Sequence, residues 1–371
     1  MAEPAAVETT RIQRPAPSAS SDPVAAPQSR HLEPARRYPE ASQQHALRLA
    51  QQVGSQHDNF VICPEPLQLT MAALYEASTA PQARSQIDSS VLGGMGDSSA
   101  IVLKEKRQEL TEMLDRVNAG APENDPNLRI TTRAALGVPV ELGGVSEKYK
   151  PTAEQLGLAP LSFKRTDPSG SEGPAAVING FLGAEVLKPS PLDANMSFAL
   201  ATTTDIKGKF QTPFQRTDPA RKDPDTGEIT YPAMLIGNGA GRYTFEVTGR
   251  PGQEGVIIPL ANNGGYLYLF GVRDKADSEQ LLAMLADKGV KAMVTDRQPT
   301  GPDSKVKVGA CHIECDIDFR QAYEDMGVKD LMQEDSAGLS GITGEGRVWL
   351  QQFPGRASFT IGEKGFEASQ Q

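Results

Sequence analysis

The chain has few of the residues from which catalytic and metal sites are usually built. Its 371 residues include three cysteines and four histidines, and His31 lies in a proline-rich stretch near the N-terminus. An odd and sparse set of cysteines does not form a disulfide framework. The sequence also lacks a GxGxxG motif after a strand, a GxxxxGKS/T loop, HExxH and GxSxG. We therefore expect neither an enzyme nor a bound cofactor or metal.

The cysteines still allow two further interpretations. Cys63 is close in sequence to His57 and could form a hydrolase pair with it, but an apolar Val-Ile-Cys-Pro run favours a buried, inert thiol. Cys311 and Cys315 lie in a predicted strand and could be half of a metal site with His312. That histidine would point to the opposite face, and zinc needs three or four convergent ligands, so two buried thiols are the favoured interpretation.

Basic runs, long apolar runs and a signal peptide are also missing. The formal charge is −10 and there is no Lys/Arg-rich segment, which argues against a nucleic-acid partner. No apolar stretch approaches the roughly 20 residues that a membrane span requires, so we expect no membrane partner. The N-terminal MAEPAAVETT lacks the basic and apolar regions of a secretory signal.

Residues 1–40 are predicted to be a disordered leader. They contain seven prolines and many Ala and Ser, and Tyr38 is their only aromatic residue. Such a segment cannot bury enough apolar surface to offset its ordering entropy. It is either an inert extension or a targeting signal that is read outside the signal-peptide route.

From Ser42 onward the patterns alternate between helix and strand without a repeat. Ala46, Leu49 and Val53 form one helical stripe, and Ser42 is a plausible N-cap. Helical patterns come early and strands dominate late, with an apolar hairpin around Ala-Asn-Asn-Gly-Gly at residues 256–271. This order predicts an α+β fold.

Eight segments resemble, in order and approximate spacing, motifs of the serpin family of serine-protease inhibitors. Seven of them are residues 59–67, 76–87, 178–179, 207–214, 231–234, 256–271 and 323–331. The eighth resembles the hinge of the family's reactive-centre loop, Glu-Glu-Gly-Thr-Glu-Ala, and consists of Glu363, Lys364, Gly365, Phe366, Glu367 and Ala368.

The resemblance implies helices packed around three β-sheets. It also implies a serine-type endopeptidase inhibitor, or an inhibitor homologue, that acts by inserting its reactive loop into the main sheet. The implied partner is a target serine protease, or alternatively a cysteine protease, and the implied state is a monomer. The family is extracellular, whereas the lack of a signal peptide favours a cytoplasmic location or another export route.

The hinge departs from the family at two positions that would face into the sheet. Phe366 stands where the family has Thr or Ser, and Gln370 follows on the same face. Extra bulk in a packed site costs roughly 1–3 kcal/mol, and a buried amide adds a penalty of its own. These residues favour the alternative function, a non-inhibitory serpin-fold interaction protein whose body is a docking surface.

The family's gating region beneath the main sheet is also altered. Cys63 replaces the Ser before Pro64, Thr202 replaces an Asn, and Gly355 replaces a His. A polar network that loses several members together is expected to give way to a different packing arrangement.

The chain stops at Gln371, inside the loop that the resemblance implies. We therefore expect residues 41–371 to form a serpin-like domain that lacks the closing C-terminal strands. Two unfilled strand edges would follow. One is the slot in the main sheet between the strands at 196–206 and 347–361, and the other lies beside the hairpin at 256–270.

Overall fold

Helices form most of the first third of the chain in the computed structural model. The structure describes residues 29–57, 60–167, 169–183, 197–216, 221–222, 229–231, 234–238, 242–250, 252–272, 274–300, 305–344, 348–350 and 353–370. Its α-helices are α1 Ser29–Gln56, α2 Pro64–Ala77, α3 Pro81–Ile87, α4 Ser99–Val117, α5 Lys150–Gln155, α6 Pro174–Leu182, α7 Lys275–Lys288, α8 Val290–Met293, α9 Phe319–Asp325 and α10 Ser340–Thr343.

The first helix begins earlier than the sequence pattern predicted. α1 starts at Ser29 and not at Ser42, so the predicted start was wrong. The predicted stripe does face the core, because Leu49 and Val53 are buried. The part of the leader prediction that falls on residues 1–28 lies outside the described residues.

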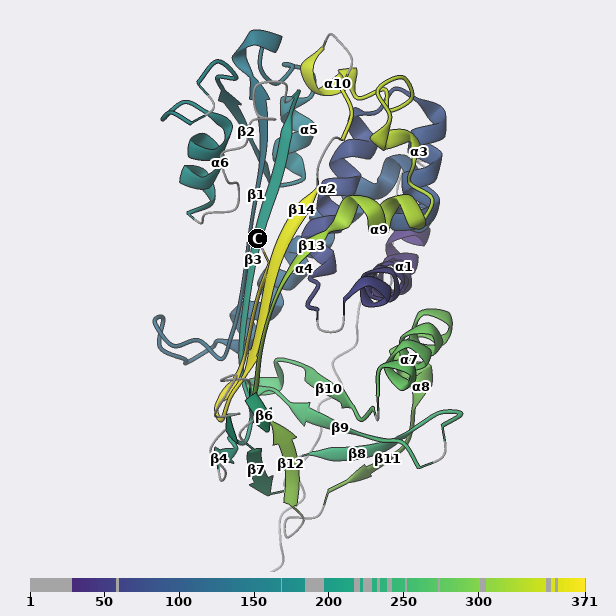
Figure 1. Cartoon of the computed structure of the whole chain (residues 1–371), viewed down its shortest axis with the longest axis vertical. Helices are drawn as coiled ribbons and strands as arrows, with labels where there is room; N and C mark the ends of the chain where they lie inside the picture. The colour runs from purple at the N-terminus through teal and green to yellow at the C-terminus, as the bar shows by residue number, and fades with distance from the viewer. Residues whose placement is uncertain are drawn as a thin grey trace, which may run out of the picture.

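A six-stranded sheet, here called the main sheet, runs along the long axis of the molecule (Figure 1). Its strand order is β13-β14-β15-β3-β1-β2, and β1 and β2 are its parallel pair. The strands are β1 Leu128–Pro139, β2 Leu158–Phe163, β3 Ala199–Lys209, β13 Cys311–Asp318, β14 Pro354–Ile361 and β15 Gly365–Gln370. β14 begins at Pro354, so the long strand predicted from residue 347 is shorter than expected.

In the described part of the chain, three smaller sheets lie at the other end of the molecule (Figure 1). Their orders are β10-β9-β8-β11, β12-β7-β4 and β5-β6. The strands are β4 Gln215–Arg216, β5 Arg221–Lys222, β6 Ile229–Tyr231, β7 Met234–Asn238, β8 Tyr243–Val247, β9 Glu254–Pro259, β10 Tyr266–Phe270, β11 Val294–Pro299 and β12 Lys305–Gly309. The predicted hairpin is confirmed, since β9 and β10 pair antiparallel around the Asn/Gly connection.

The largest hydrophobic core fills the space between the main sheet and the helices α1, α2 and α9. This core contains two fully buried polar side chains that contact each other. His45 of α1 and Tyr323 of α9 are both buried, and the His45 Nε2 atom lies 3.1 Å from the Tyr323 hydroxyl oxygen. Tyr323 also stacks on Phe353, with ring centroids 5.7 Å apart. Burial lowers the pKa of His45 to about 3, so the ring is neutral in the folded protein.

The α+β class predicted from the sequence is confirmed. Helices cover one face of the main sheet, and α6 lies on the opposite side (Figure 1). None of the helices over the described ranges is long and apolar enough to span a membrane.

Candidate functional site

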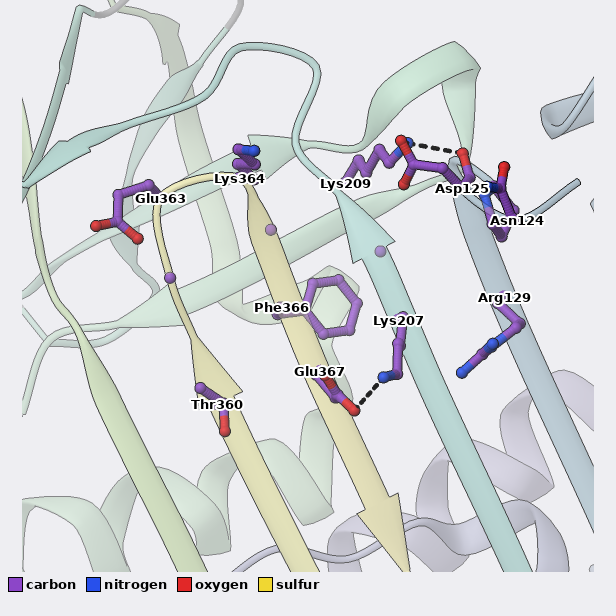
Figure 2. Close-up of a pocket in the computed structure, with 14 residues that line it drawn as sticks. Asn124, Asp125, Arg129, Lys207, Lys209, Thr360, Glu363, Lys364, Phe366 and Glu367 are labelled. Carbon is purple, nitrogen blue, oxygen red and sulfur yellow. Dashed lines mark hydrogen bonds and ion pairs between the residues drawn. The ribbon is translucent and has the colours of Figure 1, made fainter. Parts of the chain in front are cut away.

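The hinge-like segment folds back after β14 and becomes β15, an inner strand of the main sheet (Figure 2). A tight turn makes the reversal possible, with the Gly362 N–H donating to the Gly365 carbonyl oxygen at 2.9 Å. β15 pairs antiparallel with β14 on one side and with β3 on the other. A strand therefore fills the slot beside residues 204–209 of β3, and the prediction of an unfilled main-sheet slot was wrong over this stretch.

Backbone contacts fix the start of the inserted strand. The Phe210 N–H donates to the Lys364 carbonyl oxygen at 2.9 Å, and the Phe214 N–H donates to that of Glu363 at 2.7 Å. The Glu363 carboxylate also pairs with Arg216 at 2.8 Å. These contacts tie the turn to the chain that follows β3, so the point of entry into the sheet is defined on two sides.

Phe366 fits into the sheet because Gly208 faces it. The two residues are register partners on β15 and β3, and a Cβ atom on Gly208 would lie 2.6 Å from Phe366 Cε1. The Phe366 ring also packs against Phe359 of β14, with centroids 6.2 Å apart. The overpacking expected from the sequence is thus relieved by a missing side chain on the neighbouring strand.

Gln370 has a partner as well. It is 2% exposed, and its side-chain Oε1 accepts a hydrogen bond from the backbone N–H of Cys63 at 2.5 Å. Cys63 is the N-cap residue of α2, with Pro64 as the first helical residue. The buried amide expected to oppose insertion therefore connects β15 to the helix beneath it.

Burial, together with the nearby Glu65 carboxylate, raises the pKa of Cys63 to about 12. The thiol stays protonated, and a nucleophile would need the thiolate. Burial raises the pKa of Cys311 and Cys315 too, and both are free thiols on the inner side of β13. His312 points to the outer face and contacts the Thr360 hydroxyl at 2.7 Å.

Aromatic packing occupies the region where the gating residues were expected. A Cβ atom at Gly355 would lie 2.3 Å from Phe319 Cε2, so no larger residue fits there while Phe319 keeps its place. Phe319 in turn contacts Phe353, with centroids 5.8 Å apart. Thr202 is buried on β3, two residues from Thr204, whose hydroxyl lies 3.2 Å from that of Thr132.

The outer face of β15 carries polar partners across the sheet. Glu367 lies directly opposite Lys207 of β3, and the two side chains form an ion pair at 2.5 Å (Figure 2). Ser369 contacts Ser358 of β14 at 2.8 Å through the hydroxyl groups. Lys207 is also the register partner of Arg129 on β1, which places two cations side by side.

Several residues that shape this site were not identified as such from the sequence. Gly208 and Lys207 lie in the motif at 207–214. Gly208 faces Phe366 and Lys207 faces Glu367 only because of the register between β3 and β15, two strands that are far apart in the chain. Arg216 and Phe319 also act through tertiary contacts. No group of three or more His, Cys, Asp or Glu side chains is placed to hold a metal within the described part of the chain.

The main sheet is a six-stranded mixed sheet in which the hinge-like segment forms an inner strand. The family model for serpins, described as serine protease inhibitors, matches residues 40–371. The chain belongs to the serpin family.

Curated relatives and solved structures agree with this assignment. The chain is 24% identical over 299 residues to bovine alpha-1-antiproteinase, covering 75% of this chain and 68% of that protein. It is 21% identical over 184 residues to human Serpin B7, covering 50% of this chain and 48% of the relative, so the match spans about half of Serpin B7.

Ovalbumin from the emu, Dromaius novaehollandiae, shares the fold with a TM-score of 0.71 and 15% identity, covering 90% of this chain and 88% of that one. Reactive-loop-cleaved human thyroxine-binding globulin gives a TM-score of 0.70 at 15% identity, covering 91% and 97%. At these identities the structures establish a common fold.

Proposed function

We propose that this serpin acts as a serine-type endopeptidase inhibitor by inserting its reactive loop into the main sheet. The observation that carries the proposal is β15, which occupies an inner position between β14 and β3. The segment that becomes this strand is the one that resembles the family's hinge. The target would be a serine protease, or alternatively a cysteine protease.

The proposed mechanism uses strand insertion to trap an intermediate. The protease nucleophile attacks a peptide carbonyl in the loop, the new amine leaves, and an acyl ester links the protease to the hinge side of the chain. Insertion of the hinge then carries the attached protease along before water can hydrolyse the ester. Insertion must therefore be fast and favourable, which requires each inward side chain of β15 to find room.

The inward side chains of β15 support favourable insertion. Phe366 is received by Gly208, and Gln370 accepts from Cys63. Ala368 between them is small and faces Phe359 and Ile206 on the two neighbouring strands.

A chimera tests whether this body and hinge can trap a protease. Residues 41–370 would be joined to the remaining reactive loop and closing strands of bovine alpha-1-antiproteinase. We expect incubation with a serine protease that cleaves this loop to yield an adduct that survives denaturing gel electrophoresis. Cleavage without an adduct, in a chimera that still unfolds cooperatively, would overturn the proposal.

Two variants of the chimera provide matched controls. Ala368→Arg puts a large cation on the inward face and should convert the chimera into a simple substrate. Ser369→Arg places the same side chain on the outward face, one residue away, and should leave adduct formation intact. Equal behaviour of the two variants would argue against insertion as the cause of the adduct.

A second candidate function is a non-inhibitory interaction protein that binds a partner through its body. The observation that favours it is the exposed apolar surface at β10, where Tyr266 is 51% exposed and Tyr268 is 36% exposed. If the chimera is cleaved without trapping the protease, this second function is the one to pursue.

A further inference from the structure

An open cavity of about 710 Å³ lies at the end of the main sheet where the hinge segment enters (Figure 2). We call it the entry cavity. Its walls come from the turn and the start of β15, from the adjoining ends of β3 and β1, and from the loop at 124–126. Its volume lies within the range of about 300–1,000 Å³ that is usual for small-molecule sites.

The carboxylates that line the entry cavity already have cationic partners. The pairs are Glu367 with Lys207 at 2.5 Å, Asp125 with Lys209 at 2.7 Å, and Glu363 with Arg216 at 2.8 Å. Two further cations line the cavity, Arg129 and Lys364. Neither forms a salt bridge with another described residue, and Lys364 helps to lower the pKa of the adjoining Glu363 carboxylate. The charge that remains available to a ligand is therefore positive.

These two cations lie on opposite sides of the entry cavity. Arg129 projects from β1, and Lys364 stands on the turn that leads into β15 (Figure 2). Arg129 is also the register partner of Lys207, and like charges directly opposite each other on neighbouring strands are unfavourable. Glu367 relieves this repulsion at Lys207 and leaves the Arg129 guanidinium to attract an anion.

Part of the cavity lining, here called the glycine floor, carries no side chain. Gly208, Gly362 and Gly365 contribute backbone without side chains, and Phe366 lies beside them. We propose that the entry cavity binds an organic dianion with two acidic groups separated by an uncharged body. One acidic group faces Arg129, the other faces Lys364, and the body rests on the glycine floor.

Such a ligand would be coupled to insertion of the loop, and this step rests on the proposed function. The entry cavity is complete only when residues 362–367 are in place, since they form one of its walls. A ligand that binds the inserted state alone stabilises that state in proportion to the logarithm of its concentration over Kd. The ligand would therefore favour the inserted form of the protein.

Calorimetric titration of the full chain with simple carboxylates tests the site. The probes are the dicarboxylates succinate, adipate and sebacate, with hexanoate as the monocarboxylate of the same length as adipate. We expect one dicarboxylate length to bind best and hexanoate to bind at least about tenfold more weakly than adipate, the factor that corresponds to about 1.4 kcal/mol.

Variants then assign the two ends of the site. Arg129→Gln and Lys364→Gln should each weaken the best dicarboxylate about tenfold and bring its affinity close to that of hexanoate. Lys307→Gln, which replaces an exposed lysine on β12 outside the cavity, should leave the affinity unchanged. Equal binding of mono- and dicarboxylates, equal affinity in all three variants, or no binding at all would overturn the site.

The failure of this site can be told apart from failure of the proposed function. Limited proteolysis of the same samples reports whether the segment around Gly365 is protected within the sheet. A protected segment without dicarboxylate binding would overturn the ligand site and leave loop insertion standing. An unprotected segment would instead count against the inserted strand and hence against both.

Discussion

Gly208 and Phe366 face each other across β3 and β15, and their sizes are complementary. The aromatic ring takes the space that a side chain at position 208 would fill, since a Cβ atom there would lie 2.6 Å from the ring. Neither residue on its own explains the arrangement. A phenylalanine without the glycine would overpack the sheet, and the glycine without the phenylalanine would leave a gap.

A double-mutant cycle measures this complementarity. Gly208→Ala should destabilise the protein by about 1–3 kcal/mol because the added methyl meets the Phe366 ring. Combining it with Phe366→Thr should recover part of that loss, giving a coupling energy of about 0.5–3 kcal/mol. Urea unfolding of the wild type, both single variants and the double variant supplies the four values. Additive losses would mean that the two residues do not share the space.

His45 and Tyr323 are a buried pair with a cost that depends on pH. The folded protein holds the pKa of His45 at about 3, whereas an unfolded chain has a histidine pKa of about 6.5. Between these values the unfolded chain binds a proton that the folded chain does not. Stability is therefore full above about pH 6.5 and falls as the pH drops toward 3.

The variant His45→Gln should remove this dependence. We expect the wild type to lose up to about 1.4 kcal/mol per pH unit more than the variant between pH 6 and pH 4. Tyr323 keeps a hydrogen-bonding neighbour in the variant, which limits other changes. The matched control is His312→Gln on the exposed face of β13. Parallel curves for the wild type and His45→Gln in urea unfolding at several pH values would contradict the assignment.

At the scale of elements, β15 places one carboxylate in a row of side chains across the outer face of the main sheet. The register partners in this row are His312, Thr360, Glu367, Lys207 and Arg129. Glu367 is the one acidic member among them. The ion pair with Lys207 is partly exposed, with the two side chains about half accessible, so its contribution is small and sensitive to salt.

Replacing Glu367 separates loss of attraction from added repulsion. Glu367→Gln removes the pair and should cost no more than about 1 kcal/mol. Glu367→Lys puts three cations next to one another and should cost more than the glutamine variant, with the difference shrinking at high salt. Thermal unfolding at low and high ionic strength provides the comparison. A difference that does not depend on salt would point to packing in place of charge.

The position of α1 determines how many N-terminal residues can be deleted without loss of stability. The composition of residues 1–28, rich in Pro, Ala and Ser, predicts no contribution to the folded core. Deleting them should leave the thermal midpoint nearly unchanged. Deleting residues 1–45 removes His45 from its place beside Tyr323 and should lower the midpoint by several degrees. A clear drop with the shorter deletion would show that the first residues stabilise the domain.

For the whole molecule, local patterns predicted the elements better than their assembly. The hairpin at β9 and β10 and the late run of strands followed from apolar periodicity and turn residues. The start of α1 at Ser29 did not follow from these local patterns, because Pro34 and Pro39 argued against a helix there. The insertion of β15 could not be read from the hinge alone. It depends on Gly208 and Cys63, which lie far away in sequence and meet Phe366 and Gln370 through tertiary structure.

The two strand edges that the sequence predicted to be open have different outcomes. β15 pairs with residues 204–209 of β3, so this part of the main sheet offers no free edge. β10 is the outermost strand of its sheet in the described part of the chain. Its inner side chains Leu267 and Leu269 pack on a core cluster, and Tyr266 and Tyr268 are exposed on the other face. An extended strand with unpaired backbone groups and apolar neighbours favours pairing with another strand.

An extended apolar peptide should therefore bind along β10 and stabilise the protein. Each added residue would form ladder hydrogen bonds with β10, and alternate side chains would cover Tyr266 and Tyr268. At a peptide concentration of about 100 times Kd the gain in stability would be about 2.7 kcal/mol, which thermal unfolding detects as a rise of several degrees in the midpoint.

The peptides would carry the sequences of the C-terminal strands of bovine alpha-1-antiproteinase, beside scrambled versions of the same composition. A peptide with the sequence of residues 365–370 should have no effect, because β15 already occupies its place. Tyr268→Lys should weaken the response to the matching peptide, since it removes apolar surface beside the edge. A midpoint that does not depend on peptide sequence would mean that the β10 edge is closed in solution, and the prediction of an open strand edge would then fail at both places.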